Sequence, residues 1–125
     1  MKKLILLIVL VSTGFFVNAQ NTAAKPKEKP DANTRATRLT ETMNTQLGLT
    51  ANQKTKAFAI NLERAKGMDA NHAKNAENKD ELAKGKNVIL TKWDKDIRAI
   101  LTADQLPKWN KYIEEQKVNH SEVKE

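Results

Sequence analysis

The side chains that could perform chemistry are few and widely separated in this 125-residue sequence. It contains no cysteine, and its two histidines, His72 and His120, lie in polar stretches with no nucleophile beside them. Ser121 stands in a charged C-terminal tail, where nothing would activate its hydroxyl. The glycines are too far apart to form a phosphate-binding loop. We therefore predict that the chain is not an enzyme, has no catalytic residue and uses no cofactor.

Metal ligation would have to begin at one of the histidines. His72 has Asp69 three residues before it and Glu77 five residues after it, and His120 has only Glu122 nearby. Metal sites need more closely clustered histidine, cysteine or carboxylate ligands than these. We expect both histidines to be solvated, and we predict no metal site.

Residues 1–19 have the pattern of a secretory signal peptide. Lys2 and Lys3 form a positive start, residues 4–17 an apolar run, and residues 17–19 a small-residue cleavage site. The apolar run is shorter than the roughly 20 residues that span a bilayer, although an uncleaved anchor is the alternative. We expect cleavage between Ala19 and Gln20, and no membrane insertion of the mature chain.

Charge and cysteine content narrow the possible partners. Removing Lys2 and Lys3 lowers the formal net charge from +7 to +5, which favours acidic surfaces. Nucleic acid is a poor partner, because export removes the protein from it and no basic stripe is interleaved with aromatic residues. Without cysteine the exported chain has no disulfides, so packing or assembly must stabilise it.

The elements of this chain are organised around a repeated motif, L-T-A-[ND]-Q, at residues 49–53 and 101–105. A threonine followed three residues later by glutamine is a capping box, so each copy predicts the first turn of a helix. Gly48 suits the left-handed end of the preceding helix. Pro107 lacks an amide, so the second helix could begin again near it after a separate short turn. We assign six motif residues to helix capping: Leu49, Thr50, Gln53, Leu101, Thr102 and Gln105.

Apolar periodicity predicts four helices and no strand, hence an all-α fold. After a disordered arm over residues 20–33, the helical domain covers residues 34–118, and residues 119–125 form a frayed tail. We expect helices from 33 or 34 to 47, from 50 to about 75, from 79 or 80 to 100, and from 103 or 107 to 118. The expected buried stripes are Leu39, Met43 and Gln46 or Leu47; Phe58, Leu62 and Ala65; Leu82, Ile89, Trp93, Ile97 and Ile100; and Leu106, Trp109, Tyr112, Ile113 and Gln116. So thin a core favours a homodimer.

The twice-used L-T-x-x-Q motif in a small, basic, exported helical chain resembles the Spy/CpxP family of bacterial periplasmic proteins. That family includes chaperones, signalling inhibitors and zinc-resistance-associated proteins. The resemblance covers residues 35–117 and implies a periplasmic four-helix hairpin bundle that forms a cradle-shaped antiparallel homodimer.

The leading hypothesis is an ATP-independent periplasmic chaperone that binds partly unfolded envelope proteins under envelope stress. The alternatives are a regulator that docks on the periplasmic domain of a sensor kinase, and a metal-responsive protein. Candidate partner-binding residues lie away from the predicted core stripes, with Ile60 as an apolar point on a basic surface, although solvation alone would also explain them. They are Lys54, Lys56, Ile60, Arg64, Lys84, Lys95 and Arg98.

Overall fold

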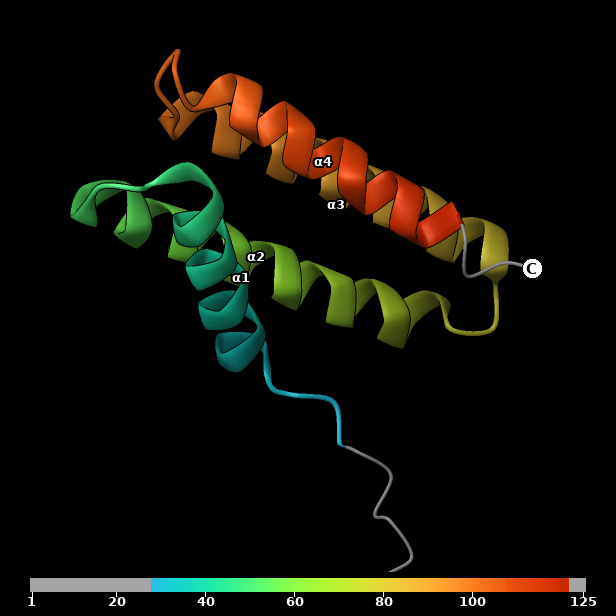
Figure 1. The fold of residues 1–125 in the computed structure, drawn as a ribbon. Helices are drawn as coiled ribbons and strands as arrows, with labels where there is room; N and C mark the ends of the chain where they lie inside the picture. The colour runs from blue at the N-terminus through green and yellow to red at the C-terminus, as the bar shows by residue number, and fades with distance from the viewer. Residues whose placement is uncertain (1–27, 122–125) are drawn as a thin grey trace, which may run out of the picture.

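The computed structural model describes residues 28–121, without the side chains of the last two, and within that range it is all-helical (Figure 1). The helices are α1 (Ala32–Leu47), α2 (Ala51–Asn75), α3 (Lys79–Ile100) and α4 (Leu106–Ser121). The predicted all-α class and the break between residues 75 and 79 are confirmed. The predicted signal peptide, residues 20–27 of the arm and residues 122–125 lie outside the described residues.

Two predicted boundaries are wrong by a few residues. Asp31 caps α1 by accepting a 2.9 Å hydrogen bond from the amide of Thr34, so Ala32 and Asn33 belong to the helix and not to the arm. A cap of this kind satisfies an amide that would otherwise lack a partner. At the other end, α4 continues to Ser121, so the predicted frayed tail begins as helix.

The helices pack in sequence order, with α1 against α2, α2 against α3, and α4 also touching α1. Figure 1 shows α3 and α4 lying alongside each other, with α2 forming the other long side and α1 crossing it. Long side chains connect α3 to α4: the rings of Trp93 and Trp109 meet edge to face with centroids 5.1 Å apart. The position of α2 between α1 and α3 decides which of its residues are buried.

The core joins all four helices and the α1–α2 connection. Its buried apolar members are Met43, Leu47, Leu49, Ala57, Trp93, Ile97 and Trp109. The predicted stripes of α1 and α3 are largely confirmed, but the prediction for α2 is right only at Ala65. Phe58 and Leu62 are only half-buried, and the buried stripe runs through Gln53, Ala57 and Asn61 to Ala65. In α4, Gln116 is exposed and not buried as predicted. Because α2 has a neighbour on two sides, small or hydrogen-bonded side chains occupy its centre, where helices approach closely.

Asn61 is a buried polar junction between three helices. Its side chain is 1% exposed. Its Nδ2 donates to Thr40 Oγ1 of α1 at 2.9 Å, and its Oδ1 accepts from Trp93 Nε1 of α3 at 2.8 Å. Buried polar groups are costly unless paired, so this asparagine fixes the relative positions of α1, α2 and α3.

The far end of the α2–α3 hairpin relies on close approach at a glycine. A Cβ atom at Gly85 would lie 2.1 Å from Asn71 Oδ1, whereas one at Gly67 would lie 3.5 Å from the nearest Ile89 carbon. Asn71 Nδ2 donates to the carbonyl of Leu82 at 2.9 Å. Gly85 therefore leaves room for a side chain that connects the two helices.

Candidate functional site

The first copy of the motif forms the capping box that the sequence predicts. The amide of Gln53 donates to Thr50 Oγ1 at 3.2 Å, and Gln53 Oε1 accepts from the amide of Thr50 at 2.9 Å. Gly48 ends α1 in the left-handed conformation (φ 64°), with its amide bonded to the carbonyl of Asn44. Leu49 is buried in the core, as expected for the apolar contact after such an ending.

The second copy forms only half of a box. Gln105 Oε1 accepts from the amide of Thr102 at 3.0 Å, but the Gln105 amide bonds to the backbone carbonyl of Thr102 and not to its hydroxyl. Residues 103–105 form a turn, and α4 begins at Leu106. Pro107 then lies in the first helical turn, where its missing amide costs little. The predicted restart near Pro107 is confirmed.

The two motif glutamines also bind each other, which the sequence pattern did not predict. Gln53 Nε2 donates to Gln105 Oε1 at 2.7 Å, and Gln105 Nε2 donates to Gln53 Oε1 at 3.0 Å. Gln53 Nε2 also reaches the carbonyl of Ile100 at the end of α3, while Gln105 Nε2 reaches the carbonyls of Leu47 and Gly48 at the end of α1. We call this pair the glutamine clasp. It joins the α1–α2 connection to the α3–α4 connection, so these residues support the fold.

Away from the clasp, Arg64 is the most unusual charged residue of the described structure. Its guanidinium carbon lies 4.7 Å from the centroid of the Trp93 ring, within the range of a cation–π contact. Burial lowers the pKa of Arg64, the electrostatic interaction with Tyr112 opposes that shift, and the charge of Arg35 adds to it. Its Nε is buried without a hydrogen-bond partner.

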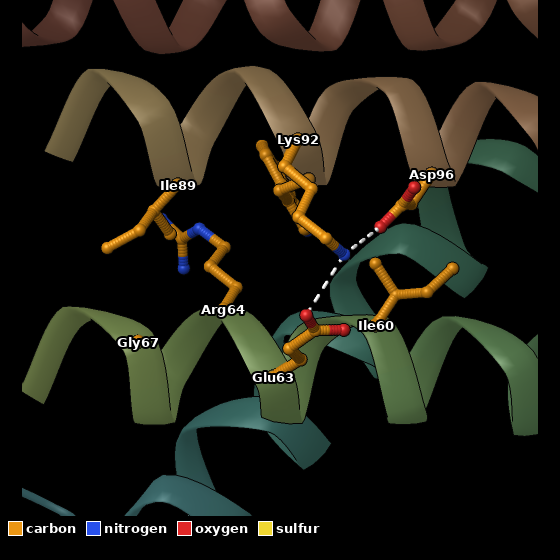
Figure 2. A pocket seen from close by; sticks show the side chains of 8 residues that line it. Ile60, Glu63, Arg64, Gly67, Ile89, Lys92 and Asp96 are labelled. Atoms are coloured by element: carbon orange, nitrogen blue, oxygen red, sulfur yellow. Dashed lines mark hydrogen bonds and ion pairs between the residues drawn. The ribbon is translucent and has the colours of Figure 1, made fainter. Parts of the chain in front are cut away.

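A small cavity of about 110 Å³ lies beside Arg64, between α2 and α3. Figure 2 shows Arg64 rising from α2 next to Ile89 of α3, with Lys92 reaching down between Glu63 and Asp96. Lys92 Nζ lies 2.9 Å from Glu63 Oε1 and 2.6 Å from Asp96 Oδ2. These hydrogen bonds raise the pKa of Lys92, and they occupy the two carboxylates of the cavity.

A larger groove of about 540 Å³, also bordered by Arg64 and Trp93, is lined mainly by residues of α3 and α4. We call it the α3–α4 groove. Apolar side chains contribute much of its lining, which also includes Arg98 and Lys117. The apolar members are Leu39, Leu90, Trp93, Tyr112 and Ile113. Burial raises the pKa of Tyr112, which keeps its phenol neutral at ordinary pH. The groove can therefore accept an apolar segment beside a cation.

Three of the seven predicted partner-binding residues border either the cavity or the groove. Ile60 and Arg64 line the cavity, and Arg64 and Arg98 line the groove. The expectation that Ile60 and Arg64 lie apart from the core is wrong, because Ile60 packs against the core and Arg64 lies on Trp93.

The other four residues lie elsewhere. Lys54 pairs with Glu41 at 3.0 Å and Lys84 with Glu81 at 2.8 Å. Lys56 and Lys95 are exposed. The predicted basic surface is thus divided, and only part of it borders a hollow that could hold another molecule.

Sequence reasoning missed the part played by the aromatic residues in the groove. Trp93 and Tyr112 were expected in the core, and both also border the groove. Tyr112 stacks on Trp109 with ring centroids 5.4 Å apart, and its side chain is half-exposed at the groove wall. The spacing of Trp109 and Tyr112, three residues apart on one helix, was the available signal.

Across the described residues, no three of the histidine and carboxylate side chains gather where they could hold a metal ion. None of the four helices is long and apolar enough to cross a membrane.

Comparison with known proteins gives one match. A family model described as a domain of unknown function, DUF4890, matches residues 19–109 and so includes both copies of the motif. No match was found among curated proteins or among solved structures.

Proposed function

The chain belongs to the DUF4890 family, a domain family of unknown function, and from this premise we propose that it is an ATP-independent periplasmic chaperone for partly unfolded proteins. The observation that carries the proposal is the α3–α4 groove. It is open, has apolar walls and contains Arg64, which forms no ion pair with any described residue. The resemblance of the twin motif to the Spy/CpxP family supports the same function.

Two interactions, charge attraction and then apolar burial, would act one after the other when a client binds. The net charge of +5 expected for the mature chain attracts acidic segments and speeds encounter. Apolar client side chains then displace water from Leu90, Tyr112 and Ile113, which stabilises the complex by about 25 cal/mol per Å² of apolar surface buried. Neither step requires a nucleotide. Release would follow when the client folds and buries its own apolar residues.

We also propose that the chaperone acts as a homodimer, because four helices bury only a thin core. Sedimentation of the mature chain, residues 20–125, tests this separately. A monomer at working concentration would remove the dimer and leave the groove as the binding surface.

The functional test is suppression of aggregation. The mature chain is mixed with heated citrate synthase without ATP, and light scattering is followed; we expect scattering to fall at stoichiometric ratios. Ile113→Ser, inside the groove, should weaken the effect. Val88→Ser should not, because Val88 is 70% exposed and does not line the groove. Circular dichroism confirms that both variants remain folded.

Two results would argue against the proposal. Scattering that is unchanged by the wild-type chain would refute the chaperone activity. Capture of a single stoichiometric membrane protein from envelope extract, in place of many clients, would favour the regulatory alternative.

A further inference from the structure

We propose that the α3–α4 groove selects extended client segments in which a carboxylate side chain lies among apolar residues, and that Arg64 binds that carboxylate. This inference rests on the proposed chaperone function and specifies its substrate class.

The first argument is that Arg64 has no acidic partner among the described residues, although it is half-buried. None of the ion pairs among the described residues involves it. Its Nε is buried and makes no hydrogen bond. A charged group without a partner in a partly desolvated place is costly, so proteins normally pair it. A ligand carboxylate in the groove would supply the opposite charge that the guanidinium lacks.

The second argument is that the nearby acids are already occupied. In the cavity, Glu63 and Asp96 both bind Lys92 (Figure 2). In the groove, Arg98 Nε lies 2.8 Å from Asp94 Oδ2, and Lys117 Nζ lies 3.0 Å from Glu114 Oε1. These pairs cancel in charge, which leaves Arg64 as the uncompensated positive charge among the groove-lining residues. The groove is therefore complementary to one negative charge.

The third argument concerns geometry and strength. Trp93 holds the guanidinium against its ring, so part of the side-chain ordering that binding requires is present before a ligand arrives. Guanidinium and carboxylate can form two parallel hydrogen bonds, and hydrogen bonds between charged groups are roughly twice as strong as neutral ones. The surrounding apolar walls reduce the screening by water.

The fourth argument identifies the occupant as an extended polypeptide. The α3 wall of the groove runs from Asn87 to Arg98, which is about 16 Å at 1.5 Å per residue. An extended chain advances ~3.3 Å per residue, so about five residues would fit along it. A non-native segment of that length would present its side chains to the groove singly.

The test uses two peptides with blocked ends that differ in one side chain. Both consist of leucine and phenylalanine flanked by soluble residues, and one carries a central Glu where the other carries Gln. Binding to the unaltered mature chain is followed by tryptophan fluorescence. The sequence has two tryptophans, and the one under Arg64 borders the groove. We expect the Glu peptide to bind about tenfold more tightly than the Gln peptide. Equal affinities would overturn the inference without relying on any variant.

Variants then assign the effect to one residue. Arg64→Gln should abolish the preference for the Glu peptide. Arg64→Lys should keep a reduced preference, because lysine retains the charge but cannot form two parallel hydrogen bonds with a carboxylate. Arg38→Gln is the matched control, since it removes the same charge from an exposed position outside the groove. If Arg64→Gln kept the tenfold preference while folded by circular dichroism, Arg64 would not be the carboxylate site.

The outcome separates this inference from the chaperone proposal. If both peptides bind equally well and aggregation of citrate synthase is still suppressed, the chaperone function stands and the carboxylate selectivity fails. If neither peptide binds and aggregation is not suppressed, both fail.

Discussion

The strongest prediction concerns the glutamine clasp, and it takes the form of a double-mutant cycle with Gln53→Leu and Gln105→Leu. Leucine keeps a similar volume but removes both the donor and the acceptor. Either substitution breaks the two hydrogen bonds between the glutamines, of 2.7 and 3.0 Å. Each one also breaks the bonds that its own amide makes with the backbone.

The magnitudes follow from those backbone bonds. Gln53 loses bonds of 2.9 Å to the Thr50 amide and to the Ile100 carbonyl. Gln105 loses its 3.0 Å bond to the Thr102 amide, and its bonds to the Leu47 and Gly48 carbonyls are long, at 3.4 and 3.3 Å. With ~1 kcal/mol for each of the two shared bonds and for each backbone bond near 3 Å, and with the two long bonds of Gln105 neglected, we expect a loss of about 4 kcal/mol for Gln53→Leu and about 3 kcal/mol for Gln105→Leu.

The double variant should lose less than the sum of the two single losses. The shared bonds can be lost only once, and two leucines facing each other leave fewer unpaired groups than one leucine facing an amide. We expect a coupling free energy of about 1–2 kcal/mol. The measurement is guanidinium chloride unfolding followed by far-ultraviolet circular dichroism, with an unchanged denaturant slope as the check on two-state behaviour.

Gln46→Leu and Gln116→Leu provide the control cycle, because both glutamines are exposed on their helices. These substitutions should change the free energy of unfolding by less than about 0.5 kcal/mol each and should be additive. Additivity in the Gln53 and Gln105 cycle, to within about 0.5 kcal/mol, would refute the clasp as a coupled unit.

Three further predictions concern local features and use the same unfolding assay. Thr50→Ala should cost about 1 kcal/mol because it removes a side-chain cap, whereas Thr102→Ala should cost clearly less because its hydroxyl makes no such bond; equal losses would contradict this. Gly67→Ala should stabilise α2 by about 1 kcal/mol, whereas Gly85→Ala should give no gain, because its Cβ would displace the asparagine amide that bridges the hairpin. Hydrogen bonds from Lys29 and then Arg35 lower the pKa of Asp69. Its ion pairs therefore stabilise the fold above the unfolded-state pKa and are lost as pH falls through the lowered value, so Asp69→Asn should destabilise at pH 7 and have little effect near pH 2.

The ends of the helices could be predicted from sequence because each depends on a few adjacent residues. Thr50 with Gln53 predicts the start of α2, and Gly48 predicts the end of α1. The polar stretch before Lys79 predicts the turn into α3. Such signals are local, since a cap bonds to amides within the same turn. They need no knowledge of the partner helix.

The buried face of α2 could not be predicted in the same way. Amphipathic periodicity finds one apolar stripe, but α2 packs against α1 on one side and α3 on the other. Ile60 and Arg64 face α3, and they appeared to lie on the outer surface because the expected stripe pointed elsewhere. Asn61 appeared to be a surface residue because its partners, Thr40 and Trp93, come from other helices. Its spacing of four from Ala57 and from Ala65 was the overlooked signal.

The groove itself arises from the contrast between the two ends of the α3–α4 pair. Near the connection, Trp109 holds α4 to α3, because its ring is fully buried against Trp93 and its Nε1 donates to Asp94 Oδ1 at 2.7 Å. An indole between two helices also keeps their backbones apart, since its width exceeds that of an alanine or glycine contact. Farther along α4, Ile113 and Lys117 border the groove. Their side chains are too narrow or too polar to fill the gap between α3 and α4 that the Trp109 ring maintains. The residues that stabilise the fold at one end therefore produce the open apolar surface at the other.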